Sequence, residues 1–258
     1  MDNMKRDLPV AVFDSGLGGI SVLRELRALM PEENYLYFGD SANAPYGVRS
    51  LDEVRALTVD AISGLYQRGI KAAVIACNTA TSAAITTLRE RFADIPVIGM
   101  EPALKPAVLE HPHECVLVLA TALTLREEKF SHLMERYDQR AEVISLPCPE
   151  LVEFVERGEL DSPALDAYLQ QRLGPWRERA DAAVLGCTHF PFLKNAIRKA
   201  LNENAVLYDG GAGTARQTRR QLELRDLRRE GDDLGSVVIE NSLDTPEILG
   251  RSCFLLEL

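Results

Sequence analysis

A chain of 258 residues, 46% of them hydrophobic, is long enough to bury a sizeable core in one large or two smaller domains. Its formal net charge of -10 would repel the phosphate backbone of a nucleic acid, so we expect no nucleic-acid partner. The N-terminus lacks the apolar stretch of a signal peptide, and no later run reaches membrane-spanning length. We therefore expect a cytoplasmic protein without a membrane partner.

Strand-like and helix-like segments alternate through the first hundred residues. The helix-like segment at residues 20–30 places Val22, Leu23 and Leu26 on one apolar face, which is typical of a helix that packs on a sheet. The alternation predicts βαβ units and a parallel sheet. The strand-like runs are residues 9–13, 35–38, 72–76 and 96–99.

A second series follows, and it predicts a second, similar half. Its strand-like runs are residues 115–120, 142–146, 182–186 and 205–208. We expect an α/β fold of two similar doubly wound parallel-sheet domains related by pseudo-two-fold symmetry, with the active site in the cleft between them. The first domain is expected over residues 1–98 plus 207–258, and the second over residues 99–206.

Five cysteines are scattered along the chain without CxxC pairs, which indicates reduced thiols. The histidines show no HExxH pattern, and no Cys/His group has zinc-site spacing, so we expect no metal. Cys115, Cys148 and Cys253 lie in or beside apolar or proline-containing runs, where a thiol is ordinarily a small buried hydrophobe.

Cys77 and Cys187 differ because both follow a strand-like run, in VIACNTA and VLGCTHF. The carboxyl ends of parallel strands form the crevice where ligands bind. Asn78, Thr79 and Thr188 follow the cysteines and offer polar groups and N-caps to the next helix. A helix N-terminus lowers a thiol pKa from about 8.5 towards neutrality and favours a nearby carboxylate. From these residues alone, a structural role for each cysteine stays open.

Two glycine-containing loops also follow strand-like runs. DSGLGG, residues 14–19, fits a dinucleotide-binding loop poorly because Ser21 occupies the place of the third glycine. Its glycines allow close approach to a small ligand, with Asp14 and Ser15 at the strand end, although Asp14 has the alternative of a helix cap. GDSANAPYG, residues 39–47, is either an ordinary loop or, through Tyr46 and Gly47, part of a site. His189 could orient a thiol, act as an acid or base, or be a core histidine.

Taken together, DSGLGG, DSANAPYG, ACNTA and GCTHFP closely resemble the motifs of the bacterial glutamate racemase family, over roughly residues 9–210. The last two motifs are shared by the wider aspartate/glutamate racemase superfamily. The first two are typical of the glutamate branch.

The resemblance implies an enzyme that interconverts L- and D-glutamate without a cofactor and supplies D-glutamate for peptidoglycan. It implies that Cys77 and Cys187 are the two catalytic proton donors and acceptors, serving the D- and L-glutamate faces respectively. Asp14, His189 and Glu156 would assist them. The expected substrate-binding residues are Asp14, Ser15, Tyr46, Gly47, Asn78, Thr79, Thr188 and His189. A homodimer is also expected from the family.

The chain departs from the family pattern at a few positions. Asp40, Ser41, Ala42 and Asn43 replace a more common DTAR, Glu153 replaces a frequent proline, and residues 209–211 read DGG where a serine commonly follows the aspartate. None of these positions is one of the two cysteines.

Three other functions stay open. A racemase for aspartate or another amino acid would keep the cysteine pair, and a decarboxylase would need only one cysteine. A non-catalytic amino-acid-binding module would need neither. The charged segment at residues 217–233 interleaves acids and bases, which favours a solvated helix face over a docking surface.

Overall fold

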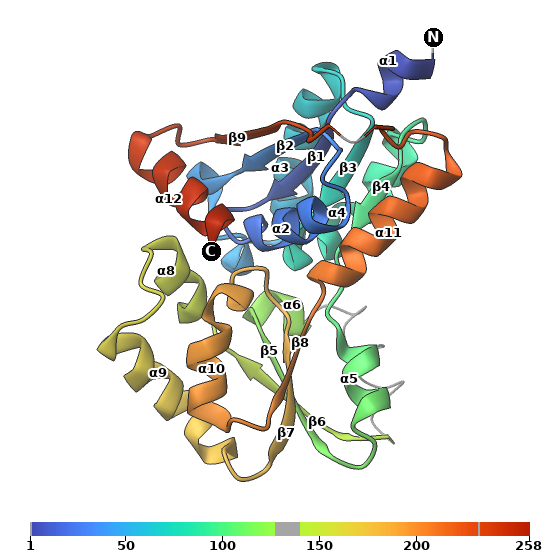
Figure 1. The fold of residues 1–258 in the computed structure, drawn as a ribbon. Helices are drawn as coiled ribbons and strands as arrows, with labels where there is room; N and C mark the ends of the chain where they lie inside the picture. The colour runs from blue at the N-terminus through green and yellow to red at the C-terminus, as the bar shows by residue number, and fades with distance from the viewer. Residues whose placement is uncertain (1, 127–139, 232) are drawn as a thin grey trace. The chain divides into compact units, whose positions relative to one another are not determined.

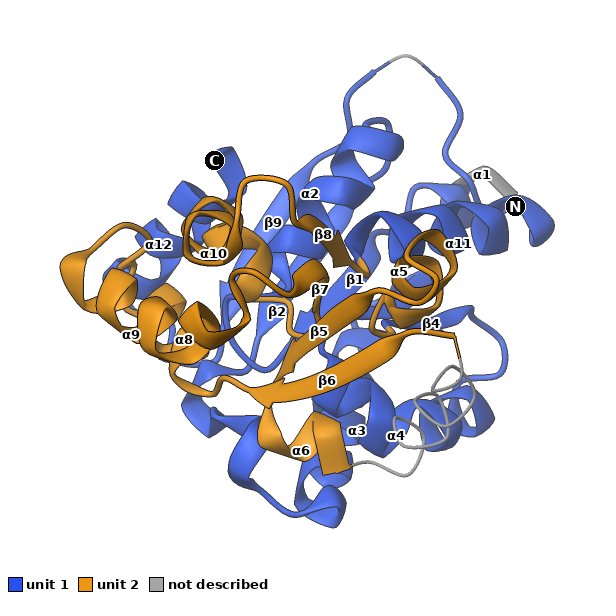
Figure 2. Ribbon diagram, turned by 90° about the horizontal axis from the view of Figure 1, so that it is seen from below, with its two compact units in different colours: residues 1–100, 211–258 blue, residues 101–210 orange. Residues whose placement is uncertain are grey.

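The computed structural model describes residues 2–126, 140–231 and 233–258. The chain divides into two compact units, coloured separately in Figure 2: unit 1 is residues 1–100 with 211–258, and unit 2 is residues 101–210. Each unit holds one parallel sheet with helices against it (Figure 1), so the expected α/β class with two parallel sheets is confirmed. The division into domains at residues 98 and 206 stays a prediction.

The sheet of unit 1 has the strand order β4-β3-β1-β2-β9, and every neighbouring pair is parallel. All five residues of β1 are buried at its centre. Right-handed crossovers from β1 to β2 and from β2 to β3 run in opposite directions, so α2 and α3 cover opposite faces. The strands are β1 (Val10–Asp14), β2 (Tyr35–Gly39), β3 (Ala72–Ile75), β4 (Val97–Gly99) and β9 (Val237–Asn241).

The helices of unit 1 form two layers. Helix α2 packs with α11 and α12, whereas α3 packs with α4. Helix α3 begins with a capping box in which Ser50 and Glu53 bond each other's backbone N–H groups, which satisfies two otherwise unpaired donors. The helices are α1 (Asp2–Arg6), α2 (Ile20–Leu29), α3 (Leu51–Gln67), α4 (Asn78–Arg91), α11 (Gly211–Leu224) and α12 (Pro246–Glu257).

The sheet of unit 2 has the order β6-β5-β7-β8 and is also parallel throughout. Its central strand β5 is buried at every residue. Helix α5 packs on β5, β7 and β8, while α9 packs against α10. The elements are α5 (Leu104–Glu110), β5 (Cys115–Ala120), α6 (Ala122–Arg126), β6 (Glu142–Pro147), α8 (Glu150–Glu156), α9 (Pro163–Leu173), β7 (Ala180–Leu185), α10 (Lys194–Leu201) and β8 (Val206–Asp209).

All eight strand-like runs of the sequence are strands, with ends that differ by one or two residues. Strand β9 was not predicted. The structure corrects two other expectations. Cys253 is exposed rather than buried, because the buried stripe of α12 runs through Ile248, Ser252 and Leu255. The helix in the charged segment ends at Leu224, so the described residues that follow it, 225–231 and 233, are not a helix face.

Ion pairs fix the segment between α11 and β9 in place. Arg228 Nη2 lies 2.7 Å from Glu32 Oε1, and the backbone N–H of Arg229 donates to Glu33 Oε1 at 2.8 Å. Glu33 also pairs with Lys71 at 2.5 Å, with side chains that are 0% and 1% exposed. Burial lowers the pKa of Lys71, while Glu33 opposes that shift. Removing Lys71 or Glu33 would leave the other charge buried and uncompensated. Since Glu33 also accepts from Arg229, the same carboxylate holds the segment that leads to β9.

Among the described residues, no helix combines the length and the hydropathy needed to span a bilayer.

A substitution at Gly39 would test how closely the loop after β1 approaches the end of β2. A Cβ at Gly39 would lie 2.4 Å from the carbonyl oxygen of Gly16, whereas a Cβ at Gly64 in α3 would meet nothing within 4 Å. We expect Gly39→Ala to lower the free energy of unfolding by about 1–3 kcal/mol. The control Gly64→Ala should raise it by about 0.5–1 kcal/mol. Urea unfolding measures both, and equal effects of the two substitutions would contradict the crowding at Gly39.

Candidate active site

Cys77 lies two residues beyond β3 and is the N-cap of α4. Its backbone is extended, and its Sγ accepts a hydrogen bond from the backbone N–H of Ala80 at 3.4 Å. The sequence suggested Asn78 or Thr79 as the cap, but the cysteine sulfur takes this role itself. A negative charge on Sγ would be stabilised by the N-terminal end of the helix dipole.

Ser15 joins Cys77 to a buried carboxylate. Ser15 Oγ lies 3.6 Å from Cys77 Sγ and donates to Asp14 Oδ1 at 3.1 Å. Asp14 is fully buried, and its Oδ1 also accepts from the backbone N–H of Gly16 at 3.0 Å. A hydroxyl has one proton, so when Ser15 donates to Asp14 the thiol of Cys77 must be the donor to Ser15. With this arrangement of protons Cys77 is a thiol, whereas the Ala80 N–H and the helix N-terminus would stabilise a thiolate once the proton has left.

The loop at residues 40–47 presents Tyr46 to the same group of residues. Tyr46 OH donates to Asp40 Oδ2 at 2.7 Å, and the ring lies 6.4 Å from that of Phe13. Burial and this hydrogen bond raise the pKa of Tyr46, with smaller contributions from Asp40, Cys77 and Asp14. Tyr46 is therefore a neutral phenol within electrostatic range of Cys77 and Asp14. Sequence reasoning missed Asp40, whose signal was its place directly after β2.

Asn78 carries a polar group without a partner. Its side chain is 5% exposed, and within the described part of the chain neither Nδ2 nor Oδ1 has a hydrogen-bond partner. A buried amide costs free energy unless it is bonded, so such a group in a native structure calls for a ligand or a water. It adjoins Cys77 in the first turn of α4, where backbone N–H groups also favour an anion.

Cys187 lies two residues beyond β7, in the second unit. The strand approaches β5 closely here: Gly186 N donates to Leu119 O at 2.7 Å, and a Cβ at Gly186 would lie 2.9 Å from that oxygen. A short 3-10 helix, η4 (Phe190–Leu193), follows with His189 at its N-cap position. The expectation that Thr188 caps a helix is therefore wrong, because the chain first makes a tight turn that contains Pro191.

His189 and Glu156 extend from Cys187 as a hydrogen-bonded chain. His189 Nδ1 lies 3.6 Å from Cys187 Sγ, and His189 Nε2 lies 2.6 Å from Glu156 Oε1 at the end of α8. Burial alone lowers the pKa of His189, but the hydrogen bonds to Cys187 and Glu156 outweigh it and hold the pKa well above its ordinary value. A positively charged imidazole beside Cys187 would stabilise a thiolate.

The structure thus groups the predicted residues within each unit. In unit 1, Asp14, Ser15, Tyr46 and Asn78 surround or adjoin Cys77, and Thr79 and Gly47 follow in sequence. In unit 2, Cys187, His189 and Glu156 form one chain of contacts, and Thr188, which is 2% exposed, lies between Cys187 and His189 in the sequence. The roles of these residues in a reaction stay predictions.

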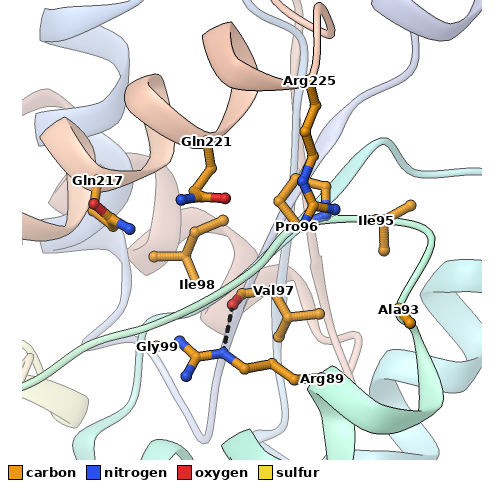
Figure 3. Close-up of a pocket in the computed structure, with 10 residues that line it drawn as sticks. All are labelled: Arg89, Ala93, Ile95, Pro96, Val97, Ile98, Gly99, Gln217, Gln221 and Arg225. Atoms are coloured by element: carbon orange, nitrogen blue, oxygen red, sulfur yellow. Dashed lines mark hydrogen bonds between the residues drawn. The ribbon is translucent and has the colours of Figure 1, made fainter.

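A separate pocket of unit 1 contains none of the predicted site residues. Its volume is about 440 Å³, and it lies beside the edge strand β4, with Arg89 Nε donating to Val97 O at 3.2 Å. Gln217, Gln221 and Arg225 face β4 from the side of α11 (Figure 3).

Comparison with known proteins defines the class of this chain. The family model described as Asp/Glu/Hydantoin racemase matches residues 20–218. A glutamate racemase of Clostridium perfringens is 47% identical over 259 residues, which cover 100% of both chains. A glutamate racemase of Clostridium acetobutylicum is 47% identical over 251 residues, covering 97% of this chain and 98% of the relative.

Solved structures of glutamate racemases have the same fold as this chain. The structure of Escherichia coli glutamate racemase with L-glutamate and the activator UDP-MurNAc-Ala has a TM-score of 0.84 and 34% identity, covering 97% of this chain and 94% of that one. Glutamate racemase of Francisella tularensis with D-glutamate has a TM-score of 0.84 and 26% identity, covering 100% and 95%. The chain therefore belongs to the glutamate racemase family.

The contacts of His189 with Cys187 and Glu156 predict how its pKa should respond to substitution of either partner. Glu156→Gln and Cys187→Ser should each move the titration midpoint of His189 down, because each removes a partner that raises its pKa. The unfolded value is about 6.5, so the contact stabilises the fold fully below that pH. This contribution is lost as the pH rises through the higher folded pKa.

NMR titration of His189 measures the midpoint, and unfolding at several pH values measures the stability. Glu153→Gln is the control, since Glu153 lies on the same helix and its side chain is 68% exposed beside Arg157. A midpoint in Glu156→Gln that equals that of Glu153→Gln would show that the contact does not hold in solution.

Proposed function

We propose that the protein interconverts L- and D-glutamate without a cofactor, with Cys77 and Cys187 as its two acid–base residues. One observation carries the proposal: in each unit a cysteine follows the end of a buried parallel strand by two residues. Each of these cysteines has its own hydrogen-bonded polar partners. These are Ser15 and Asp14 for Cys77, and His189 and Glu156 for Cys187.

The reaction needs a base on one face of the substrate α-carbon and an acid on the other. A matched pair of thiols meets this need in both directions, because the base of one direction is the acid of the reverse. In the L-to-D direction, the Cys187 thiolate removes the α-proton and becomes a thiol. The Cys77 thiol delivers its proton to the opposite face and becomes a thiolate, so the proton count of the enzyme is unchanged.

The surroundings of the two thiols support these starting states. When Cys77 carries its proton, it can donate to Ser15 Oγ while Ser15 donates to Asp14. The raised pKa of His189 keeps a positive charge beside Cys187, which favours the thiolate there. After turnover the Ser15 hydroxyl can turn its proton towards Cys77, which would stabilise the thiolate formed there.

Hydrogen-bond donors must stabilise the carbanion, because no electron sink is proposed. The free amide of Asn78 and the backbone N–H groups at the start of α4 suit a substrate carboxylate. Thr79, Thr188, and the loop that carries Tyr46 and Gly47 would complete its binding.

The relatedness over the full length of the chain supports glutamate rather than aspartate as substrate. Relatives of the same fold have been solved with L-glutamate and with D-glutamate, the two expected reactants. In a bacterial cell the D-glutamate would be consumed in peptidoglycan synthesis.

Incubation of the purified protein with L-glutamate in deuterated water tests the reaction. We expect a mixture of both enantiomers, with deuterium at the α-carbon of the D-product, and no requirement for pyridoxal phosphate, metal or nucleotide. Chiral chromatography with mass spectrometry measures both. Folded protein that racemises aspartate and leaves glutamate unchanged would overturn the choice of substrate, and no exchange on either would overturn the function.

Cys77→Ser and Cys187→Ser should each lower kcat by about 10²–10⁴-fold, because a serine hydroxyl is a far weaker acid than a thiol. Cys253→Ser is the matched control, since that thiol is exposed on α12. It should keep the wild-type rate. Near-normal turnover by Cys77→Ser or Cys187→Ser would show that the substituted cysteine is not an essential acid or base.

A further inference from the structure

The end of β9 is bonded to the loop that carries Tyr46. Ser242 N donates to Gly39 O at 2.9 Å. Asn241 Nδ2 donates to Ser41 Oγ at 2.8 Å, and the backbone N–H of Ala42 donates to Ser242 Oγ at 2.8 Å. The last two bonds join residues 200 positions apart in the sequence.

The turn at residues 41–43 also has local contacts: Arg49 Nε donates to Asn43 O at 2.8 Å, and Asn43 N donates to Asp40 O at 3.1 Å. Ala42 is exposed, and Ser41 and Asn43 are only partly buried. Within the loop, the Asp40 carboxylate accepts from Asn43 Nδ2 at 3.0 Å and from Tyr46 OH at 2.7 Å. Tyr46 is thus bonded to Asp40, and the turn at residues 41–43, which connects Asp40 to the segment that carries Tyr46, is bonded to β9.

Asn241 itself is held firmly. Its side chain is 5% exposed, and its Oδ1 accepts from the backbone N–H of Leu243 at 3.0 Å. A Cβ at Gly39 would lie 2.8 Å from Asn241 Nδ2, so the amide packs directly on the end of β2. The bond to Ser41 thus links a fixed side chain to an exposed turn.

We propose that Asn241 and Ser242 are positioning residues for substrate binding, acting through residues 41–46. This inference rests on the proposed function, because it takes the loop to contact glutamate. Without the two bonds the turn would visit other conformations, and the apparent affinity for substrate would fall with the fraction of competent loop. The contacts of both thiols would be unchanged, so KM should respond and kcat should not.

The test compares two exposed serines at opposite ends of β9. Ser242→Ala should raise the KM for glutamate by about two- to tenfold, the range for loss of one hydrogen bond, with kcat within about twofold of wild type. Asn241→Ala should act in the same direction. Ser242→Thr keeps the hydroxyl and should restore the wild-type KM. Ser236→Ala is the control, because Ser236 Oγ bonds Asn34 at the start of the strand.

Hydrogen exchange gives a readout that does not depend on activity. The amide of Ala42 should exchange faster in Ser242→Ala than in wild type or Ser236→Ala, whatever the substrate proves to be. Faster exchange with an inactive wild type would reject the proposed function and keep the loop contact. Unchanged exchange and unchanged KM in Ser242→Ala, or the same rise of KM in Ser236→Ala, would overturn the positioning role.

Discussion

The direction of the strands determines where polar groups can collect in this protein. Strands β1, β2 and β3 are parallel and in register, so they end at one edge of their sheet and deliver Asp14, Asp40 and Cys77 there. Strand β7 delivers Cys187 in the same way in the other unit. The buried strands are mostly apolar, so charged and hydrogen-bonding groups collect mainly at and beyond the strand ends.

The two thiols occupy chemically different surroundings. Cys77 caps a helix and contacts a hydroxyl that is bonded to a carboxylate, whereas Cys187 contacts an imidazole that is bonded to a carboxylate. The proposed racemisation needs one thiol and one thiolate at the start of each turnover, and the different partners of the two sulfurs would distinguish them.

The strand ends could be predicted from the sequence because buried parallel strands give short apolar runs with abrupt polar ends. The contact of Glu156 with His189 was expected only through family resemblance, since the two residues are 33 positions apart and meet through the packing of α8 on η4. Asn241 was missed because its contact with Ser41 depends on the pairing of distant strands. Asp40 was missed although it follows β2 directly and contacts Asn43 and Tyr46 nearby in the sequence. Strand β9 itself is mostly half-exposed, so its run VVIEN gives a weak apolar pattern.

The discontinuity of unit 1 has a consequence for synthesis on the ribosome. Unit 2 is continuous in the chain, so its sheet can form once residue 210 has emerged, whereas the edge strand β9 can join the sheet of unit 1 only after residues 237–241 have emerged. Until then the free edge of β2 remains open to pairing with other chains. The nascent sheet of unit 1 is therefore open to aggregation along β2, the strand that leads into residues 40–47, until β9 has paired with it.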